Sequence, residues 1–181
     1  MDISQAIVEG GTGAVLRYRT VAGIQQDNRI PEIFLGGFIA SGIYDKLGLH
    51  AHVEHPYTVI ANRLGTTITP DLLILMEGFK ADVAIYADTK PRAVVELKVF
   101  DDGKSAALIV ADRDKMRKLT GRCSVEAYLG ILITDASSGQ TCSQRIRLLS
   151  DCLGSEFNRV GENQRSIDGT WEWCFASARV A

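Results

Sequence analysis

Two neighbouring stretches of the chain combine apolar runs with a few charged residues in a pattern typical of β-strands. They are residues 82–86 and 93–100, and the six residues between them include a Lys-Pro step that favours a turn. Side chains of a strand alternate between its two faces, so residues two positions apart share a face. The pattern predicts an antiparallel hairpin in which residue 84 lies opposite residue 94.

The spacing of apolar residues predicts the remaining elements. Apolar residues three or four positions apart indicate helices, and short apolar runs between turn residues indicate strands. The stretch 127–134 is largely apolar, as in a central strand covered on both faces, and the stretch 171–175 alternates like a closing edge strand. Helices are predicted over residues 31–47, 105–119 and 140–153, and strands over residues 50–60, 127–134 and 171–175. This order predicts an α/β fold with a mixed β-sheet flanked by helices.

The first thirty residues give a less regular pattern. Residues 3–9 predict a short helix that ends at the pair Gly10-Gly11. Residues 10–13 are rich in glycine, like a phosphate-binding loop, but they lack the Gly-Lys-Ser/Thr ending of such loops. We therefore predict a plain turn at these glycines.

The predicted hairpin brings three ionisable residues together. With residue 84 opposite residue 94, Asp82 lies opposite Glu96, and Lys98 is diagonal to Asp82 on the same face. Two carboxylates can hold Mg²⁺ while leaving water in its coordination shell. The metal would polarise a phosphoryl oxygen and activate a water, and the lysine could orient or deprotonate that water or neutralise developing charge. A surface hairpin with a cross-strand Glu–Lys pair is the purely structural alternative.

The pattern Asp82…Glu96-x-Lys98, with its flanking apolar runs, resembles the PD-(D/E)xK nucleases, the restriction-endonuclease-like superfamily. Their core order is helix, three-strand meander, helix, strand (αβββαβ), and residues 30 to 135 match it in order. The resemblance implies one restriction-endonuclease-like domain over residues 1–181. It also implies a Mg²⁺-dependent deoxyribonuclease, with Mn²⁺ as a possible substitute, in which Asp82 and Glu96 bind the metal and all three residues are catalytic. An endonuclease role in restriction, repair or defence against mobile elements is implied as well.

Two further features bear on this resemblance. Glu32 matches an acidic residue that many members carry on the first helix, which makes it an auxiliary catalytic candidate; the helix dipole also favours a carboxylate there. The proline that precedes the aspartate in the superfamily is replaced by Ala81. The dipeptide Pro70-Asp71 is a rival, but it lies far from the Glu-x-Lys motif and can equally open a helical turn. Asp82 is preferred because the hairpin requires an aspartate at the start of the neighbouring strand.

The predicted helix 105–119 and the residues just after it carry an excess of positive charge. Lys115, Lys118 and Arg122 are candidates for contact with nucleic-acid phosphates, although such a run is most often a solvated helix face. Residues 112–119 also resemble an Asp-x-x-Lys-Leu signature found there in many relatives, whose Asp and Lys can orient neighbouring loops. The formal net charge of the chain is −2, so nucleic-acid binding would require its basic residues to gather on one face.

The predicted first strand suggests a second kind of metal site. His50, His52 and Glu54 would share one face, as transition-metal ligands do, but no distant Cys/His cluster completes the set. Glu54 is also a secondary candidate for the acidic cluster, because a glutamate recurs on this strand in some nucleases of the superfamily. Trp171 and Trp173 could stack on bases, but packing over the sheet is the simpler expectation.

Composition limits the class of protein. The chain is 46% hydrophobic and 23% charged, which is ordinary for a soluble globular domain. It shows no membrane-length apolar run, no signal sequence and no Cys-x-x-Cys pair, so we expect a reduced cytoplasmic protein that contacts no membrane. DNA is the expected partner, with RNA left open. Specificity would then come from loops, a homodimer or a larger protein partner.

A protein of another class fits the same residues. A non-cleaving module could keep the nuclease fold and act as a nucleic-acid-binding or assembly subunit, because folds can outlast their chemistry. The acidic net charge favours this alternative, whereas the presence of all three ionisable motif residues favours the enzyme.

Overall fold

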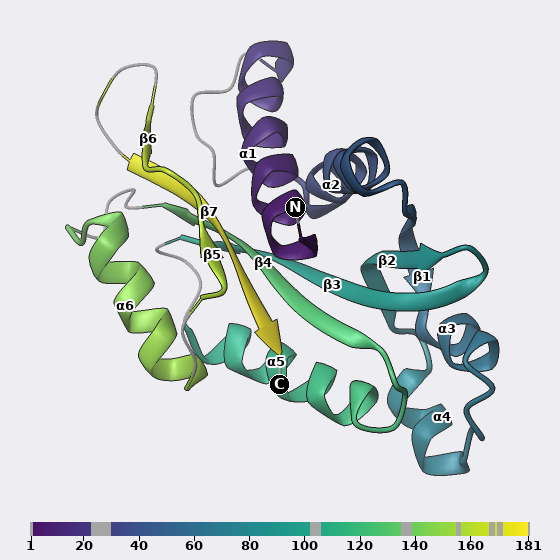
Figure 1. Cartoon of the computed structure of the whole chain (residues 1–181). Coiled ribbons are helices and arrows are strands. Elements are labelled where there is room, and N and C mark those ends of the chain that lie inside the picture. The colour runs from purple at the N-terminus through teal and green to yellow at the C-terminus, as the bar shows by residue number, and fades with distance from the viewer. Residues whose placement is uncertain are drawn as a thin grey trace.

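A mixed β-sheet of seven strands runs through the computed structural model, which describes residues 2–22, 30–101, 106–134, 139–154, 157–166, 169 and 172–180 (Figure 1). The strand order is β1-β2-β3-β4-β7-β5, and β6 also pairs with β7. β3 and β4 are parallel, and the other neighbours are antiparallel. The strands are β1 (His50–Pro56), β2 (Lys80–Ala87), β3 (Lys90–Phe100), β4 (Glu126–Thr134), β5 (Arg159–Val160), β6 (Gln164–Arg165) and β7 (Glu172–Val180).

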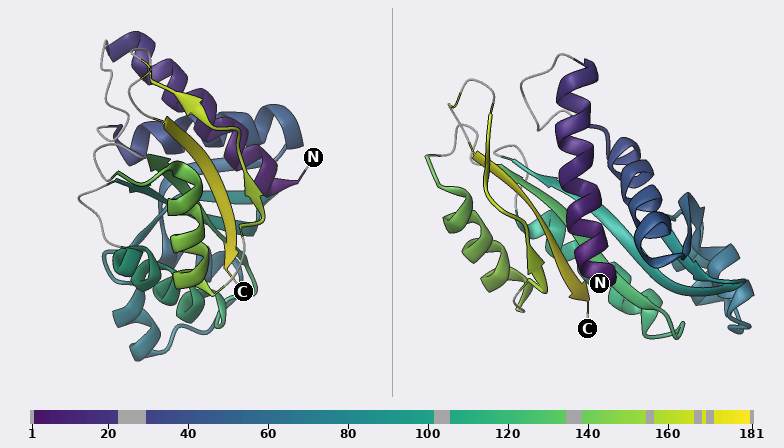
Figure 2. Two further views of the ribbon diagram at one scale, coloured as in Figure 1. Left: turned by 90° about the vertical axis from the view of Figure 1, so that its left-hand side faces the viewer. Right: turned by 45° about the horizontal axis from the view of Figure 1, so that its top comes forward.

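Helices cover both faces of this sheet (Figure 2). One face packs against α1 and α2, and the other packs against α3 to α6. In the described part of the chain, no helix is both long enough and apolar enough to cross a membrane. The helices are α1 (Ile3–Ala22), α2 (Glu32–Leu47), α3 (Tyr57–Arg63), α4 (Pro70–Met76), α5 (Ala106–Thr120) and α6 (Cys142–Leu153).

Alternation along the central strands divides the buried residues between two cores. Val83 and Val95 pack with α1 and α2, whereas their neighbours Ala84 and Val94 pack with the helices of the opposite face. β4 is buried from its second residue to its last, as expected of a strand covered on both sides. The prediction of an α/β fold with a mixed sheet between helices is therefore confirmed.

The order of elements around the hairpin also follows the prediction. The chain runs through α2, β1, β2, β3, α5 and β4, with bounds close to those predicted. The exception is β1, which ends at Pro56 and is followed by α3 instead of continuing to residue 60. Proline cannot donate a backbone hydrogen bond to a sheet, and Pro56 instead forms the N-cap of the new helix.

Gly10 and Gly11 lie inside α1, so the predictions of a short helix and a turn there were wrong. A Cβ atom on Gly10 would lie 2.9 Å from the Cα atom of Ile39, and one on Gly11 would lie 2.5 Å from the ring of Phe175. The two glycines therefore allow α1 to approach α2 and β7 closely. This packing outweighs the low helix propensity of glycine.

β7 occupies a different place in the sheet from the one predicted. It lies between β4 on one side and β5 and β6 on the other, so the prediction of an edge strand was wrong. The two-residue strands that cover it are too short to give a sequence pattern. Trp173 is fully buried and cannot stack on a base. Trp171 and the predicted helix start at Ser105 lie outside the described residues.

Candidate active site

The hairpin of β2 and β3 has the predicted register next to the candidate site, whereas the register shifts between Ile85 and Tyr86, nearer the turn. Ala84 pairs with Val94, and continuing the register by two residues places Asp82 opposite Glu96. The backbone pairing of the two strands ends just before this position. There, Oδ2 of Asp82 accepts a hydrogen bond of 2.6 Å from the backbone N–H of Leu97. The side chain of Asp82 thus provides a partner for a backbone group at the point where the two strands part.

Glu96 is buried, with 3% of its surface exposed, and its carboxylate contacts three side chains. The hydroxyl of Tyr57 donates a hydrogen bond of 3.0 Å to Oε1, which also lies 3.7 Å from Nζ of Lys115. Oε2 lies 3.9 Å from Nζ of Lys98. A buried carboxylate is tolerated only with such partners.

The ammonium group of Lys98 is the centre of the cluster. Besides Glu96, it lies 3.5 Å from Oε2 of Glu32 on α2 and 3.7 Å from Oδ2 of Asp112 on α5. Three elements that are distant in the sequence therefore meet at one lysine. The structure brings together all four residues predicted as catalytic: Asp82, Glu96, Lys98 and Glu32.

α5 contributes more to this cluster than the sequence indicated. Asp112 and Lys115, three positions apart on one helix face, lie 3.8 Å from each other and contact the site through Lys98 and Glu96. The ammonium group of Lys115 also lies over the ring of Phe79, 4.7 Å from its centroid. Both residues therefore contact the cluster directly from α5.

The other two predicted phosphate contacts lie apart from the site. Lys118 and Arg122 line a separate pocket of about 270 Å³ together with Asp71 and Leu72 of α4. Asp71 is in the first turn of that short helix, so the rival Pro70-Asp71 dipeptide begins a helix and is not part of the cluster.

The two carboxylates of the hairpin resist ionisation. Burial raises the pKa of Glu96 to about 7; the nearby charge of Asp82 adds to the rise, and the ammonium groups of Lys115 and Lys98 oppose it. Burial also raises the pKa of Asp82, against the effect of the hydrogen bond from Leu97. A cation bound between the carboxylates would favour their ionised forms.

The lysine of the motif is strongly basic. Burial by itself would lower the pKa of Lys98, but the surrounding carboxylates, with Glu32 and Asp82 foremost, raise it above its ordinary value. Lys98 is therefore protonated at neutral pH. In this arrangement it can stabilise negative charge, but it is a poor base for activating water.

Asp82 and Glu96 offer oxygen ligands suited to Mg²⁺. This ion keeps several of its waters and commonly binds to one or two protein carboxylates. In the part of the chain that the structure describes, no group of three or more His, Cys, Asp or Glu residues is arranged to hold a metal. The paired carboxylates with raised pKa values fit a magnesium site that is completed by water or substrate, and not a closed site made of protein ligands.

Tyr57 received no role from the sequence patterns, because residues 50–60 were predicted to be one strand. α3 begins directly after Pro56, and the Tyr57 hydroxyl reaches the Glu96 carboxylate from this helix. Pro56 was the sequence signal for the start of this helix, because proline rarely continues a paired strand.

The backbone of β1 is irregular at Glu54. Glu54 has a φ of 54°, and it is missing from the pairing with β2, although the register is the same on both sides of it. His55 therefore lies beside His52, with 5.0 Å between ring centroids, and Glu54 lies 3.6 Å from Lys80. The expectation of a regular strand face formed by His50, His52 and Glu54 was wrong, because the positive φ of Glu54 interrupts the alternation and the ring of His50 lies against Tyr44 of α2. Glu54 nevertheless lies near enough to Asp82 to contribute to its raised pKa.

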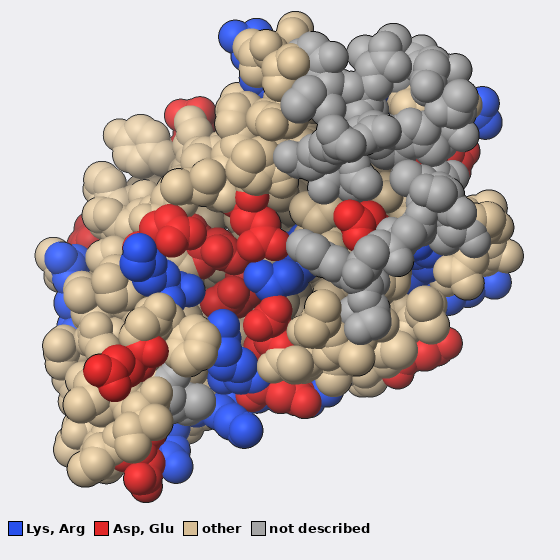
Figure 3. Space-filling model, turned by 180° about the vertical axis from the view of Figure 1, so that it is seen from behind, with Lys and Arg blue, Asp and Glu red and all other residues tan. Residues whose placement is uncertain are grey.

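On the face opposite to the one shown in Figure 1, basic and acidic side chains do not form separate patches. In Figure 3, Lys and Arg side chains are interleaved with Asp and Glu side chains near the middle of this face. The ion pairs around Lys98 and Lys115 have the same mixed character. A strand of nucleic acid at the site would therefore meet both signs of charge.

No protein-family model, curated protein or solved structure that was compared with the chain matches it.

Proposed function

We propose that the chain is a metal-dependent nuclease with a restriction-endonuclease-like core that hydrolyses DNA phosphodiester bonds. The order of α2, β1, β2, β3, α5 and β4 supports this core. One observation carries the proposal. Asp82 and Glu96 occupy facing positions where two strands part, with the protonated Lys98 beside them.

In this proposal Asp82 and Glu96 hold Mg²⁺ or Mn²⁺ through carboxylate oxygens. The ion supplies a polarised phosphoryl oxygen and a water of lowered pKa. The Tyr57 hydroxyl fixes the orientation of the Glu96 carboxylate. The ammonium group of Lys98 stabilises the negative charge that grows on the phosphoryl oxygens.

Two further acids keep this lysine in place. Glu32 and Asp112 contact the ammonium group of Lys98 from α2 and α5 respectively. They hold the charge where the substrate phosphate would lie, and they keep the lysine protonated. Glu32 is thus a positioning residue for Lys98 in this mechanism, which gives a definite form to its expected auxiliary role.

DNA as the substrate, and an endonuclease role in restriction, repair or mobile-element defence, rest on the motif Asp82…Glu96-x-Lys98. In this proposal a homodimer or a larger protein partner supplies the specificity, and the enzyme works in the cytoplasm. Each of these points can be tested with purified protein and defined substrates.

The decisive experiment is a cleavage assay on supercoiled, linear and single-stranded DNA and on RNA, each with Mg²⁺, Mn²⁺ or EDTA. Wild-type protein should cut DNA only when a metal is present, and Glu96→Gln should abolish cutting. Glu9→Gln is a matched control, because Glu9 is also an ion-paired glutamate but lies on α1 with Lys46 as its partner. No cleavage by the wild type under any of these conditions, together with no metal binding by calorimetry, would sink the proposal.

A non-cleaving nucleic-acid-binding or assembly module is the second candidate. It is favoured by the contacts of Lys98, whose three carboxylate neighbours neutralise it without any metal. The same assay separates the two candidates. Binding to nucleic acid with equal affinity in Mg²⁺ and EDTA, and without cleavage, would support the module.

A further inference from the structure

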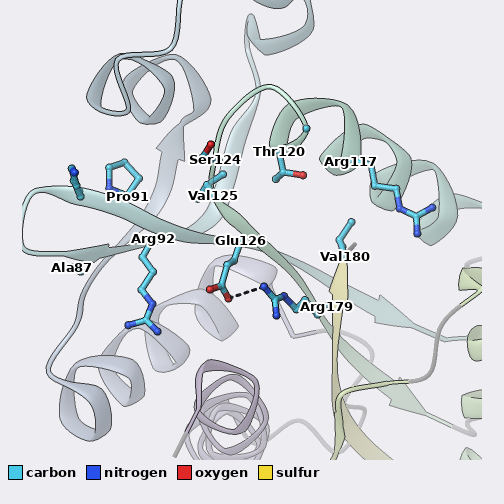
Figure 4. A pocket seen from close by; sticks show the side chains of 12 residues that line it. Ala87, Pro91, Arg92, Arg117, Thr120, Ser124, Val125, Glu126, Arg179 and Val180 are labelled. Carbon is cyan, nitrogen blue, oxygen red and sulfur yellow. Dashed lines mark ion pairs between the residues drawn. The ribbon is translucent and has the colours of Figure 1, made fainter.

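A second region of concentrated charge surrounds an open pocket of about 950 Å³ at one end of the sheet (Figure 4). The pocket is formed by the tip of the β2–β3 hairpin, the C-terminal end of α5, the start of β4 and the end of β7. In Figure 4, Arg92 and Arg179 extend on either side of Glu126, and Arg117 comes from α5. Four segments distant in the sequence thus contribute to one pocket.

The lining of this pocket is strongly cationic. Lys90, Arg92, Arg117 and Arg179 line the pocket together with a single carboxylate, that of Glu126, in a chain whose formal net charge is −2. Such an imbalance of charge within one pocket attracts anions.

The single carboxylate already has partners. Glu126 accepts a hydrogen bond from the hydroxyl of Tyr128 and lies 3.7 Å from the guanidinium of Arg179. Neither Lys90 nor Arg92 forms an ion pair with any described residue. Among the described residues, the cations of the hairpin therefore have no carboxylate within ion-pair distance.

The pocket is distinct from the candidate active site. Lys115 contacts Glu96, whereas Arg117 is two positions further along α5. Two positions correspond to a rotation of about 200° around a helix, so the two side chains leave α5 on opposite sides. A ligand bound beside Arg117 would therefore not occupy the hydrolytic centre.

The chemistry of the lining indicates what the ligand carries. Guanidinium groups bind phosphate oxygens through paired, charge-assisted hydrogen bonds. No aromatic side chain is among the described residues that line the pocket, so it offers no platform for stacking a base. We propose that the pocket binds a phosphate-bearing ligand through its phosphate groups, independently of the hydrolytic site.

The test uses the 181-residue chain at low salt in EDTA, with pyrophosphate as the probe and isothermal calorimetry as the readout. Replacing Arg92 or Arg117 by glutamate should weaken pyrophosphate binding about tenfold or more, because each change removes a charge-assisted hydrogen bond. Arg92→Gln and Arg117→Gln remove the positive charge without adding a negative one, and they should also weaken pyrophosphate binding. Arg17→Glu is the control, since Arg17 is exposed on α1 and lines none of the described pockets.

Two further ligands distinguish whether the bound phosphate belongs to a small molecule or to a nucleic-acid backbone. Binding of a nucleoside triphosphate that depends on Arg92 would indicate a small phosphorylated ligand, and Arg92-dependent binding of a short single-stranded oligonucleotide would indicate a nucleic-acid backbone. Either result supports the inference. It is overturned if pyrophosphate does not bind the wild type, if citrate binds as tightly as pyrophosphate, or if Arg17→Glu weakens binding as much as the pocket variants do.

Discussion

The hydroxyl of Tyr57 donates a hydrogen bond of 3.0 Å to Oε1 of Glu96 inside the protein. The tyrosine comes from the first turn of α3, and the glutamate comes from the middle of β3. This contact fixes one oxygen of a carboxylate that burial alone would leave hard to ionise. The hydrogen bond opposes that effect, since it lowers the pKa of Glu96.

Tyr57→Phe should therefore raise the pKa of Glu96 further. The acid limb of the pH–rate profile should move to higher pH, and cleavage at pH 7 should fall about tenfold, the typical cost of removing one hydrogen bond. Activity should recover partly at higher pH, where the carboxylate ionises. Tyr44→Phe, at an exposed tyrosine of α2, should leave the profile unchanged. A uniform loss of rate at every pH would show that Tyr57 does not act through the ionisation of Glu96.

Glu96→Gln should stabilise the metal-free protein at alkaline pH. The folded-state pKa of Glu96 is raised to about 7 from an ordinary value of 4.5, so the stability contributed by the protonated form is lost as the pH rises between these values. A neutral glutamine avoids this loss. We expect a gain on the order of 1–3 kcal/mol at pH 8 and little gain near pH 4.5. Thermal unfolding in EDTA at both pH values measures it.

The control for this prediction is Glu54→Gln, at a more exposed glutamate that has Lys80 as its partner. It should change the melting temperature little at either pH, because exposed ion pairs contribute little to stability. If Glu96→Gln gives the same change in melting temperature at pH 8 as at pH 4.5, the carboxylate does not destabilise the folded state in the way described.

The hairpin could be predicted because its information is local. Period-2 patterning on both strands is sufficient to set the register of Ala84 against Val94, and this register brings Asp82 and Glu96 face to face. The prediction of a Lys-Pro turn was wrong, because the turn is at residues 88–89 and Lys90 and Pro91 already pair within the hairpin. The apolar character of β4 likewise indicated a central strand. Such patterns depend on one element and its neighbour in the sequence.

The rest of the site depends on contacts between distant elements. The approach of Tyr57 to Glu96 follows from a helix that begins after a proline, and the contact of Asp112 with Lys98 follows from the packing of α5 on the sheet. The positive φ of Glu54 is a single-residue irregularity without a distinctive sequence pattern. Periodicity carries no information about these three features.

The positive residues of α5 and of the turn after it should divide into two groups. Lys118→Ala together with Arg122→Ala should weaken DNA binding on every sequence and reduce the slope of log K against log salt by about 0.9 for each phosphate that the variant no longer neutralises. Lys115→Ala should also slow cleavage at saturating DNA, because Lys115 contacts the Glu96 carboxylate. Fluorescence anisotropy over a range of salt concentrations measures the first effect. An unchanged slope would mean that Lys118 and Arg122 belong to a solvated helix face.

Gly11→Ala should destabilise the fold although alanine is the better helix former. Its Cβ would lie 2.5 Å from the buried ring of Phe175, and such overpacking typically costs about 1–3 kcal/mol, more than the roughly 1 kcal/mol of helix propensity gained. Gly13→Ala on the same helix is the matched control. No atom lies within 4 Å of its Cβ position, so that variant should be more stable by up to about 1 kcal/mol. Urea unfolding distinguishes the two, and equal midpoints would contradict close packing at Gly11.

Lys98→Ala separates the enzyme from the non-cleaving module. Mg²⁺ takes oxygen ligands, so removal of an ammonium group should leave metal binding by Asp82 and Glu96 largely intact. Loss of a positive charge directed at the developing phosphoryl charge should slow cleavage by roughly 10²–10³. Lys98→Arg keeps the charge and should retain more activity than the alanine variant. Calorimetry and single-turnover cleavage measure the two effects separately. Wild-type rates in Lys98→Ala would remove Lys98 from the mechanism, whereas loss of metal binding in that variant would assign it a structural role.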